Sequence, residues 1–340
     1  MGRAFCFSDT IKQMYDNAKE LIARANRIIV IQAENPDGDS LGSALALEEI
    51  FGDLGKEVSL YCPVDIPKYL RYVKGWDRVE LEFDTKADLA IILDTSADVL
   101  LTKVLETPGL RHFLETHPVL VIDHHTTAST LSFKHTMLAE ETAIATSEVI
   151  FKLAKEAGWK VSAQAAEDLL VAQLADSLGL STQTVTSESY RIAAELTELG
   201  AHVATIEERR REFMKKSPEI LRYKGELIGR IEYLLDGKLA LVHIPWEDIQ
   251  AYSDQYNPSV LVLDEMRLVE NVEVAVAIKT YPDGKLTGKL RSNQPVSETI
   301  AGYFGGGGHP YASGFRVYEE YDKIVHELVT ATDKALHEIA

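Results

Sequence analysis

Short runs of β-branched and aliphatic residues, separated by longer helical patterns, dominate the first half of the chain. The clearest runs are residues 28–31, 89–93 and 119–122, and no polar residue alternates within them. A strand that is apolar on both sides needs cover on both sides, as in a parallel sheet between two layers of helices. We therefore predict an N-terminal α/β domain whose mostly parallel sheet has helices on both faces.

The pattern changes twice in the second half of the chain. Residues 139–235 have a nearly continuous helical periodicity, and the charged segment 207–212 within them is typical of a solvated linker helix. Strand patterns return at residues 239–244, 272–280 and 285–291. We therefore predict a larger domain over 1–205, a helical linker over 206–235 and a smaller C-terminal α/β domain with a mixed sheet over 236–340.

The charge of the chain limits its partners. Lys and Arg number 35 against 53 Asp and Glu, a formal net charge of −18. Such a charge repels long nucleic acid unless it is locally reversed, but a small phosphorylated ligand remains compatible where metal ions or a basic patch neutralise the site.

Targeting and redox signals are weak. No apolar run approaches the roughly 20 residues of a membrane span, and the N-terminus lacks the apolar core of a signal peptide. The widely separated Cys6 and Cys62 do not indicate a disulfide framework. We expect no membrane partner and a cytoplasmic location.

Acidic residues and histidines gather where the predicted strands end. Asp37 and Asp39 follow the first strand, Asp94 ends the second, and residues 123–125 (Asp-His-His) close the third. Each piece alone has a plain structural reading, as a turn or as a helix cap. Because ligands of open α/β sheets bind at the carboxyl ends of the strands, the coincidence of all three predicts one shared site.

The residue types in these clusters indicate a metal centre. Carboxylates with imidazole suit Mn²⁺ or a similar borderline ion better than calcium or a thiolate zinc site. Two such ions about 3.5 to 4 Å apart can hold a phosphate for in-line attack, which implies phosphoester hydrolysis. No Gly-x-x-x-x-Gly-Lys-Ser/Thr segment occurs, so a P-loop nucleotide triphosphatase is not supported.

Five separated motifs occur in a characteristic order. They are residues 35–40 (Asn-Pro-Asp-Gly-Asp-Ser), Asp94, residues 123–125, Asp176 and residues 305–309 (Gly-Gly-Gly-Gly-His). In order and spacing they resemble the DHH phosphoesterases with a DHH-associated C-terminal domain, over about residues 20–318. The resemblance is greatest to the nanoRNase and 3′-phosphoadenosine-5′-phosphate (pAp) phosphatase subgroup, and the glycine–histidine motif argues against the related inorganic pyrophosphatases.

The resemblance implies a set of site residues. One divalent ion would be bound by Asp37 and Asp94, and a second by Asp39, Asp94, His124 and Asp176, with Mn²⁺ the favoured metal. His125 would contact the scissile phosphate, while Asp123 would orient an imidazole. The substrate's terminal phosphate and nucleoside would be held by Arg291, Ser292, Gly305, Gly306, Gly307, Gly308 and His309, because arginine and glycine-rich backbone both bind anions.

Two positions depart from the family pattern. Ala33 stands where the family has a histidine that binds the first metal, and Gln32 and Glu34 beside it should point to the opposite face of the strand. Residues 176–181 read Asp-Ser-Leu-Gly-Leu-Ser where the family more often has Asp-Thr-Gly and an aromatic residue. The first departure predicts a weakened first metal site, and the second leaves the metal ligand in place with altered substrate contacts.

We predict a metal-dependent phosphodiesterase that hydrolyses very short RNA or DNA oligonucleotides, or linear dinucleotides, to 5′-mononucleotides, with pAp phosphatase as a further activity. Two alternatives stay open. One is an enzyme acting on a cyclic dinucleotide. The other is a nucleotide-binding protein weakened in catalysis because Ala33 replaces the motif histidine. The preferred base and the oligomeric state, including a homodimer, also stay open.

Overall fold

The computed structural model describes residues 2–125 and 128–339, and the side chains of residues 2–9 and of His309 lie outside the description. The chain divides into two compact units, residues 1–214 and 215–340, which are described separately. Among the described residues, the helices are too short or too polar to span a membrane.

The first unit is built on a six-stranded parallel sheet. Its order is β3-β2-β1-β4-β5-β6, and every neighbouring pair is parallel. Between the neighbours β1 and β4 the sheet switches its direction of growth, and ligands of doubly wound sheets bind beside such a switch. The strands are β1 Arg27–Ile31, β2 Glu57–Tyr61, β3 Val79–Glu80, β4 Leu89–Leu93, β5 Val119–Asp123 and β6 Thr136–Ala139.

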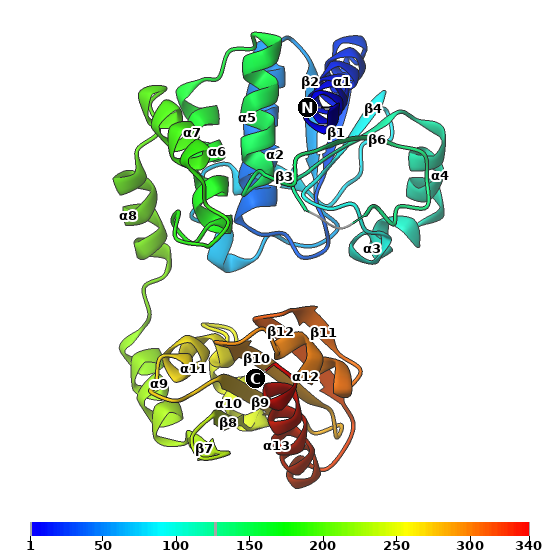
Figure 1. Ribbon diagram of the computed structural model, residues 1–340. Coiled ribbons are helices and arrows are strands. Elements are labelled where there is room, and N and C mark those ends of the chain that lie inside the picture. The colour runs from blue at the N-terminus through cyan, green and yellow to red at the C-terminus, as the bar shows by residue number, and fades with distance from the viewer. Residues whose placement is uncertain (1, 126–127, 340) are drawn as a thin grey trace. The chain divides into compact units, whose positions relative to one another are not determined.

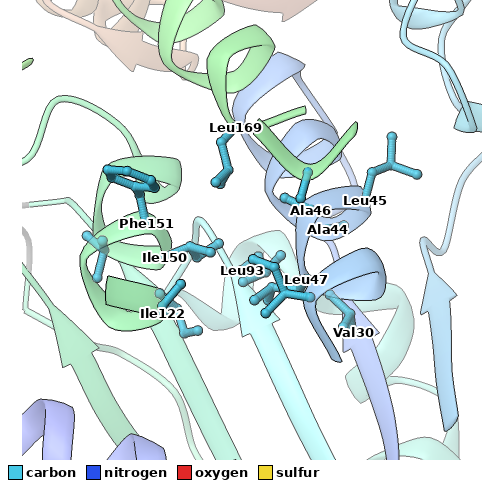
Figure 2. Close-up of a cluster of buried hydrophobic side chains, with 14 of the residues drawn as sticks. Val30, Ala44, Leu45, Ala46, Leu47, Leu93, Ile122, Ile150, Phe151 and Leu169 are labelled. Atoms are coloured by element: carbon cyan, nitrogen blue, oxygen red, sulfur yellow. The ribbon is translucent and has the colours of Figure 1, made fainter. Parts of the chain in front are cut away.

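Helices cover both faces of this sheet, as predicted (Figure 1). On one face Val30, Leu93 and Ile122 pack with α2, α5 and α6, and Figure 2 shows Leu47 and Ile150 among them. On the other face lie α3 and α4. The helices of this unit are α1 Gly2–Arg24, α2 Gly38–Asp53, α3 Thr102–Leu105, α4 Pro108–Thr116, α5 Thr146–Ala157, α6 Ala163–Asp176, α7 Ser187–Glu198 and α8 Val203–Phe213.

A close approach between α2 and α6 brings the functional ends of both helices together. A Cβ atom at Gly38 would lie 2.3 Å from the Cβ of Ala175, and one at Gly42 would lie 2.5 Å from the carbonyl oxygen of Asp168. Only glycine fits such distances, so these two residues allow the helix backbones to meet. The C-terminal residue of α6, Asp176, therefore lies near the start of α2.

Residues 206–235, predicted as one helical linker, are divided between the units. Ile206 of α8 packs into the core of the first unit, and Arg209 forms a 2.6 Å ion pair with Glu167 of α6. Tyr223 and Leu227 of the next helix, α9 (Pro218–Gly229), pack into the second unit. Apolar positions among the charged residues therefore attach each helix to a different core.

The second unit holds a mixed six-stranded sheet, as predicted, of order β11-β12-β10-β9-β8-β7. Among the described strands of this second sheet, β8 and β9 form the one parallel pair, and the other neighbours are antiparallel. α12 and α13 cover one face, whereas α9, α10 and α11 cover the β8 and β9 part of the other. The elements are β7 Glu232–Leu234, β8 Leu239–Ile244, α10 Trp246–Tyr252, α11 Pro258–Arg267, β9 Val274–Thr280, β10 Leu286–Ser292, α12 Ser297–Tyr303, β11 Gly307–His309, β12 Ala312–Val317 and α13 Tyr321–Glu338.

Candidate functional site

The turn after β1 starts helix α2. Asp37 caps the helix, and its side chain accepts hydrogen bonds of 3.0 Å from the backbone N–H groups of Asp39 and Ser40. The hydroxyl of Ser40 completes the capping box, because it accepts a hydrogen bond from the backbone N–H of Asp37. This cap starts the helix at Gly38.

Asp39 is a buried carboxylate at the start of α2. It accepts hydrogen bonds from the N–H groups of Thr146 and Ser147, at 2.6 and 3.2 Å, where α5 begins. Burial raises the pKa of Asp39 to about 6, and the charges of Asp176 and Asp37 act in the same direction. A cation at this point would offset both effects.

Asp94 lies directly after β4 in the left-handed region, with φ of 60°. Its Oδ1 accepts a 3.0 Å hydrogen bond from the hydroxyl of Thr146. Burial, and then the negative charges of Asp39 and Asp37, raise the pKa of Asp94 well above its ordinary value. The unusual backbone and the disfavoured charge mark a functional position rather than a stabilising one.

Asp123 orients the histidine pair that follows it. The buried carboxylate accepts hydrogen bonds from the N–H groups of His124 and His125 and, at 2.7 Å, from Nδ1 of His125. Burial opposes the charged form, but these contacts with His125 outweigh it, so the pKa of Asp123 lies below its usual range. The hydrogen bond to Asp123 raises the pKa of His125 in turn.

His124 is the point where the carboxylates converge. Its Nε2 lies 3.5 Å from Oδ1 of Asp94, 3.5 Å from Oδ2 of Asp176 and 3.9 Å from Oδ2 of Asp39. Its Nδ1 lies 3.3 Å from the carbonyl oxygen of Ala143, which can only accept. The proton is therefore placed on Nδ1, and the Nε2 lone pair faces the carboxylates, as a metal ligand requires.

Two groups of side chains have ligand atoms close enough to hold a metal ion. One is Asp39, His124 and Asp176, and the other is Asp94, His124 and His125; within each group all ligand atoms lie within 4.8 Å of one another. Oxygen and imidazole donors fit Mn²⁺ or a similar divalent ion. His125 joins a group although it was expected to contact phosphate, while Asp37, an expected ligand, is in neither.

The structure brings no imidazole to position 33. Ala33 is buried, and its carbonyl oxygen accepts a 3.4 Å hydrogen bond from the thiol of Cys62. Glu34 is engaged elsewhere, because its carboxylate accepts the N–H of Lys103 near the start of α3. Gln32 is buried, and neither atom of its amide has a hydrogen-bond partner among the residues that the structure describes.

The loop after Asp176 combines a buried serine with leucines in an unusual backbone conformation. Ser177 is buried and its hydroxyl donates to the carbonyl oxygen of Gln173, which ends α6. Leu178 and Leu180 follow with positive φ angles, and Leu178 is 73% exposed. The loop therefore presents a leucine side chain to solvent close to Asp176, an expected metal ligand.

In the second unit, the residues expected to bind substrate separate into two kinds. Arg291 is half-buried on β10, with one bond from Nη1 to the carbonyl oxygen of Leu290. Ser292 is buried instead: its hydroxyl donates to the carbonyl oxygen of Gln294 and accepts from Ser297 of α12. The expected direct contact between Ser292 and a substrate does not agree with this burial, because the hydroxyl is used to join β10 to α12.

The glycine run has a structural reason of its own. The N–H groups of Gly305 and Gly306 donate to the carbonyl oxygens of Gly302 and Ala301 at the end of α12, so these two amides are not free for an anion, contrary to expectation. A Cβ at Gly306 would lie 2.2 Å from the carbonyl oxygen of Gly314. Gly307 and Gly308 continue as β11, and the side chain of His309 lies outside the described residues.

Thr146 is a site residue that the sequence analysis missed. Its N–H donates to Asp39 and its hydroxyl donates to Asp94, so it joins the start of α2 and the end of β4 to α5. The available signal was a Thr-Ser pair opening a helical pattern, which is a common helix start and points to no ligand.

Comparison with known proteins finds a family model that matches part of this chain. The DHH family, N-terminal domain, matches residues 27–180. The bifunctional oligoribonuclease and PAP phosphatase NrnA of Thermus thermophilus is 28% identical over 300 residues, covering 87% of this chain and 86% of the relative. NrnA of Bacillus subtilis is 23% identical over 314 residues, covering 91% and 96%. A manganese-dependent inorganic pyrophosphatase of Bacillus subtilis is 25% identical over 178 residues, covering only 51% and 55%.

Solved structures agree on the fold. An exopolyphosphatase-related protein from Bacteroides fragilis has a TM-score of 0.83 at 23% identity, covering 95% of this chain and 96% of that one. RecJ from Thermus thermophilus, in complex with Mn²⁺, has a TM-score of 0.53 at 15% identity, covering 95% of this chain and 55% of RecJ. The resemblance drawn from the five motifs is confirmed, because the DHH family model matches residues 27–180 and relatives named NrnA match most of the chain.

Proposed function

We propose that this protein is a divalent-metal-dependent phosphoesterase that hydrolyses very short oligonucleotides or linear dinucleotides to 5′-mononucleotides. The observation that carries the proposal is the convergence of three carboxylates on Nε2 of His124, beside the switch between β1 and β4. The relatives named as oligoribonucleases and PAP phosphatases match most of the chain, whereas the pyrophosphatases match about half. This difference favours a nucleotide over pyrophosphate.

The donor set fits two divalent ions, with Mn²⁺ favoured. Asp39, His124 and Asp176 would hold one ion, and Asp94 would contribute to the other together with histidine nitrogen. Divalent ions bound here would neutralise the phosphate and lower the pKa of an attacking water. Ala33 leaves the first metal site, the one expected at Asp37 and Asp94, one nitrogen short of the family pattern.

His125 has a catalytic role in the proposal, for which its ring is protonated and binds no metal ion. The hydrogen bond from its Nδ1 to Asp123 stabilises the imidazolium form, and the side chain is 44% exposed. The proton on Nε2 is then available to a phosphate oxygen or to the leaving oxygen. Asp123 is the positioning residue, because it fixes the ring without facing the substrate itself.

We propose that the second unit binds the substrate through Arg291, with the Gly307–His309 hairpin strand beside it. The register places Ala312 opposite both Arg291 and His309, so the backbone positions of these two residues flank one small residue. Ser292 and the tight Gly306 turn would position this edge rather than contact the substrate. The same arrangement accommodates pAp, which supplies two phosphates on one nucleoside.

A single assay tests the activity. The purified full chain is incubated with a 5′-phosphorylated linear dinucleotide in Mn²⁺ or in chelator, and the products are separated by chromatography. We expect two 5′-mononucleotides in Mn²⁺ and none in chelator. Parallel reactions with pAp and with a cyclic dinucleotide define the range of substrates. Tight binding of the linear dinucleotide with no turnover at any Mn²⁺ concentration would contradict the proposal and indicate a binding protein.

A further inference from the structure

Four cationic side chains share one face of the sheet in the second unit. Lys279 on β9 and Arg316 on β12 pair with the same residue of β10, Thr287, from opposite sides. Lys289 and Arg291 follow at every second position of β10. Because side chains alternate between faces along a strand, all four project to one side, and we call them the basic strip.

The basic strip lacks acidic partners. Among the described residues, none of its four side chains forms an ion pair with a carboxylate, whereas Arg78, Arg209 and Arg230 elsewhere each do. Lys279 instead donates a 2.8 Å hydrogen bond to the side-chain oxygen of Asn257, the cap of α11. The net charge of the chain is −18, so these four cations without a carboxylate partner locally reverse its charge.

The strip is also electrostatically strained. Burial, and then the charge of Lys289, lower the pKa of Lys279 to about 8. Burial and the charge of Arg291 lower the pKa of Lys289. An anion bound on this face would offset the repulsion between these neighbouring cations.

The floor around the cations is low. The residues paired with Lys289 on the neighbouring strands are Ala277 and Gly314, and those paired with Arg291 are Ala275 and Ala312. Successive positions on this face of β10 are about 6.8 Å apart, and from Thr287 to Arg291 the face extends for about 14 Å. Ala275 and Ala277 are buried under α11, so the open part of this face lies over β10 and β12, where a regularly charged, flexible chain could lie beside Gly314 and Ala312.

We infer that the basic strip is a track for the phosphates of a short single-stranded oligonucleotide, in which Lys279, Lys289 and Arg316 hold phosphates beyond the one assigned to Arg291. Only the place of Arg291 rests on the proposed function. A nucleic acid strand carries one phosphate per nucleotide, and this regular spacing suits a strip whose cations recur along one strand.

The test is binding without turnover. Fluorescently labelled oligonucleotides of about two to six nucleotides are titrated into the full chain in chelator, at several salt concentrations. The test variant carries Lys289→Gln with Arg316→Gln. The control carries Lys323→Gln with Lys334→Gln, which removes the same charge from α13 on the other face of the sheet. Lys289→Arg, which keeps the charge, should retain binding, and thermal melting confirms that each variant is folded.

For the wild type and the control, the dissociation constant should fall with length up to about four nucleotides and then level off. The test variant should bind a tetranucleotide about tenfold more weakly. Its slope of log affinity against log salt should be smaller by about 1.4, at about 0.7 for each lost contact on a single strand. Equal affinities for test variant and control, or equally tight binding of oligoglutamate, would overturn the inference. Mn²⁺-dependent hydrolysis of the dinucleotide is scored separately, so either claim can fail without the other.

Discussion

The two units gather charge by different physical means. In the first unit, acidic side chains and His124 come from the ends of β1, β4, β5 and α6, so residues far apart in sequence meet at one buried point. In the second unit, the basic strip lies along the middle of neighbouring antiparallel strands, and register alone aligns it. The first arrangement suits compact cations and the second suits an extended anion.

The two units differ in how the fold stabilises side chains of like charge that lie close together. In the acidic cluster, the carboxylates of Asp39 and Asp94 accept hydrogen bonds from Thr146 and from the backbone at the start of α5. The side chains of the basic strip have weaker support, from the contacts of Lys279 with Asn257 and of Arg291 with the carbonyl oxygen of Leu290. Binding of a metal should therefore stabilise a preformed site, whereas binding of an anion should order mobile side chains.

The largest expected effect removes a shared charge from the acidic cluster. Asp94→Asn should lower Mn²⁺-dependent turnover by about a thousandfold or more and reduce bound Mn²⁺. In chelator the same variant should be more stable than wild type, because it relieves the repulsion that raises the pKa of Asp94. Asp236→Asn is the matched control, since Asp236 is exposed and also has a positive φ. Full metal occupancy in Asp94→Asn would remove Asp94 from the centre.

The next effect separates burial of a carboxylate from membership of the site. Asp168, on the same helix as Asp176, is buried, and burial raises its pKa to about 8. The protonated form is favoured by folding, so this contribution to stability is complete below about pH 4 and is lost as pH rises through 8. In wild type the unfolding free energy should fall by a few kcal/mol, to order of magnitude, as pH rises through this window. Asp168→Asn should remove this fall and leave the Mn²⁺ affinity unchanged. Urea unfolding at several pH values measures it; an unchanged slope would contradict the shift.

A smaller effect sharpens the comparison inside the second unit. Arg291→Ala should raise KM for a dinucleotide about tenfold with a lesser change in kcat, because the contact is equal in ground and transition states. Ser292→Ala, one position along, should instead lower the melting temperature, since its buried hydroxyl holds Gln294 and Ser297. Steady-state kinetics and thermal melting separate the two. A larger KM effect at Ser292 than at Arg291 would reverse this assignment.

The smallest expected effect is a gain. Ala33→His should increase Mn²⁺ affinity severalfold, because a neutral imidazole would add a nitrogen ligand where the family has one. Ala33→Leu is the control, since it occupies the same buried space without a nitrogen. Isothermal titration with Mn²⁺ measures both. Equal affinities for the two variants would show that the geometry drawn from the family pattern does not hold at this position.

The strands that carry the acidic site could be predicted from sequence, and the edges of the sheet could not. β1, β4 and β5 are apolar on both faces, so their residues give a strong signal. β3 spans only Val79–Glu80, and β6 is Thr136–Ala139; these short strands exist because a neighbour offers unpaired backbone groups. The periodicity of so short a segment does not indicate that it pairs with a neighbouring strand.

The site was predictable where one residue type has few roles. Asp94 and residues 123–125 follow apolar strands and stood out, but Thr146, Ser292 and Gly305 did not reveal their roles. Threonine and serine open many helices, and glycine ends many helices, so only tertiary contacts distinguish a ligand-positioning residue from a cap. The basic strip was hidden for the same reason, because its alignment depends on the register of three strands.

The most direct test of the account is the length dependence of turnover. The ratio kcat/KM is measured in Mn²⁺ over a ladder of 5′-phosphorylated oligonucleotides, because an acidic chain with one short basic strip can favour only a few phosphates. We predict a maximum at about two to four nucleotides, a fall for longer chains and a weak dependence on salt. A ratio that stays level or rises toward about twenty nucleotides would contradict the account and indicate a processive exonuclease.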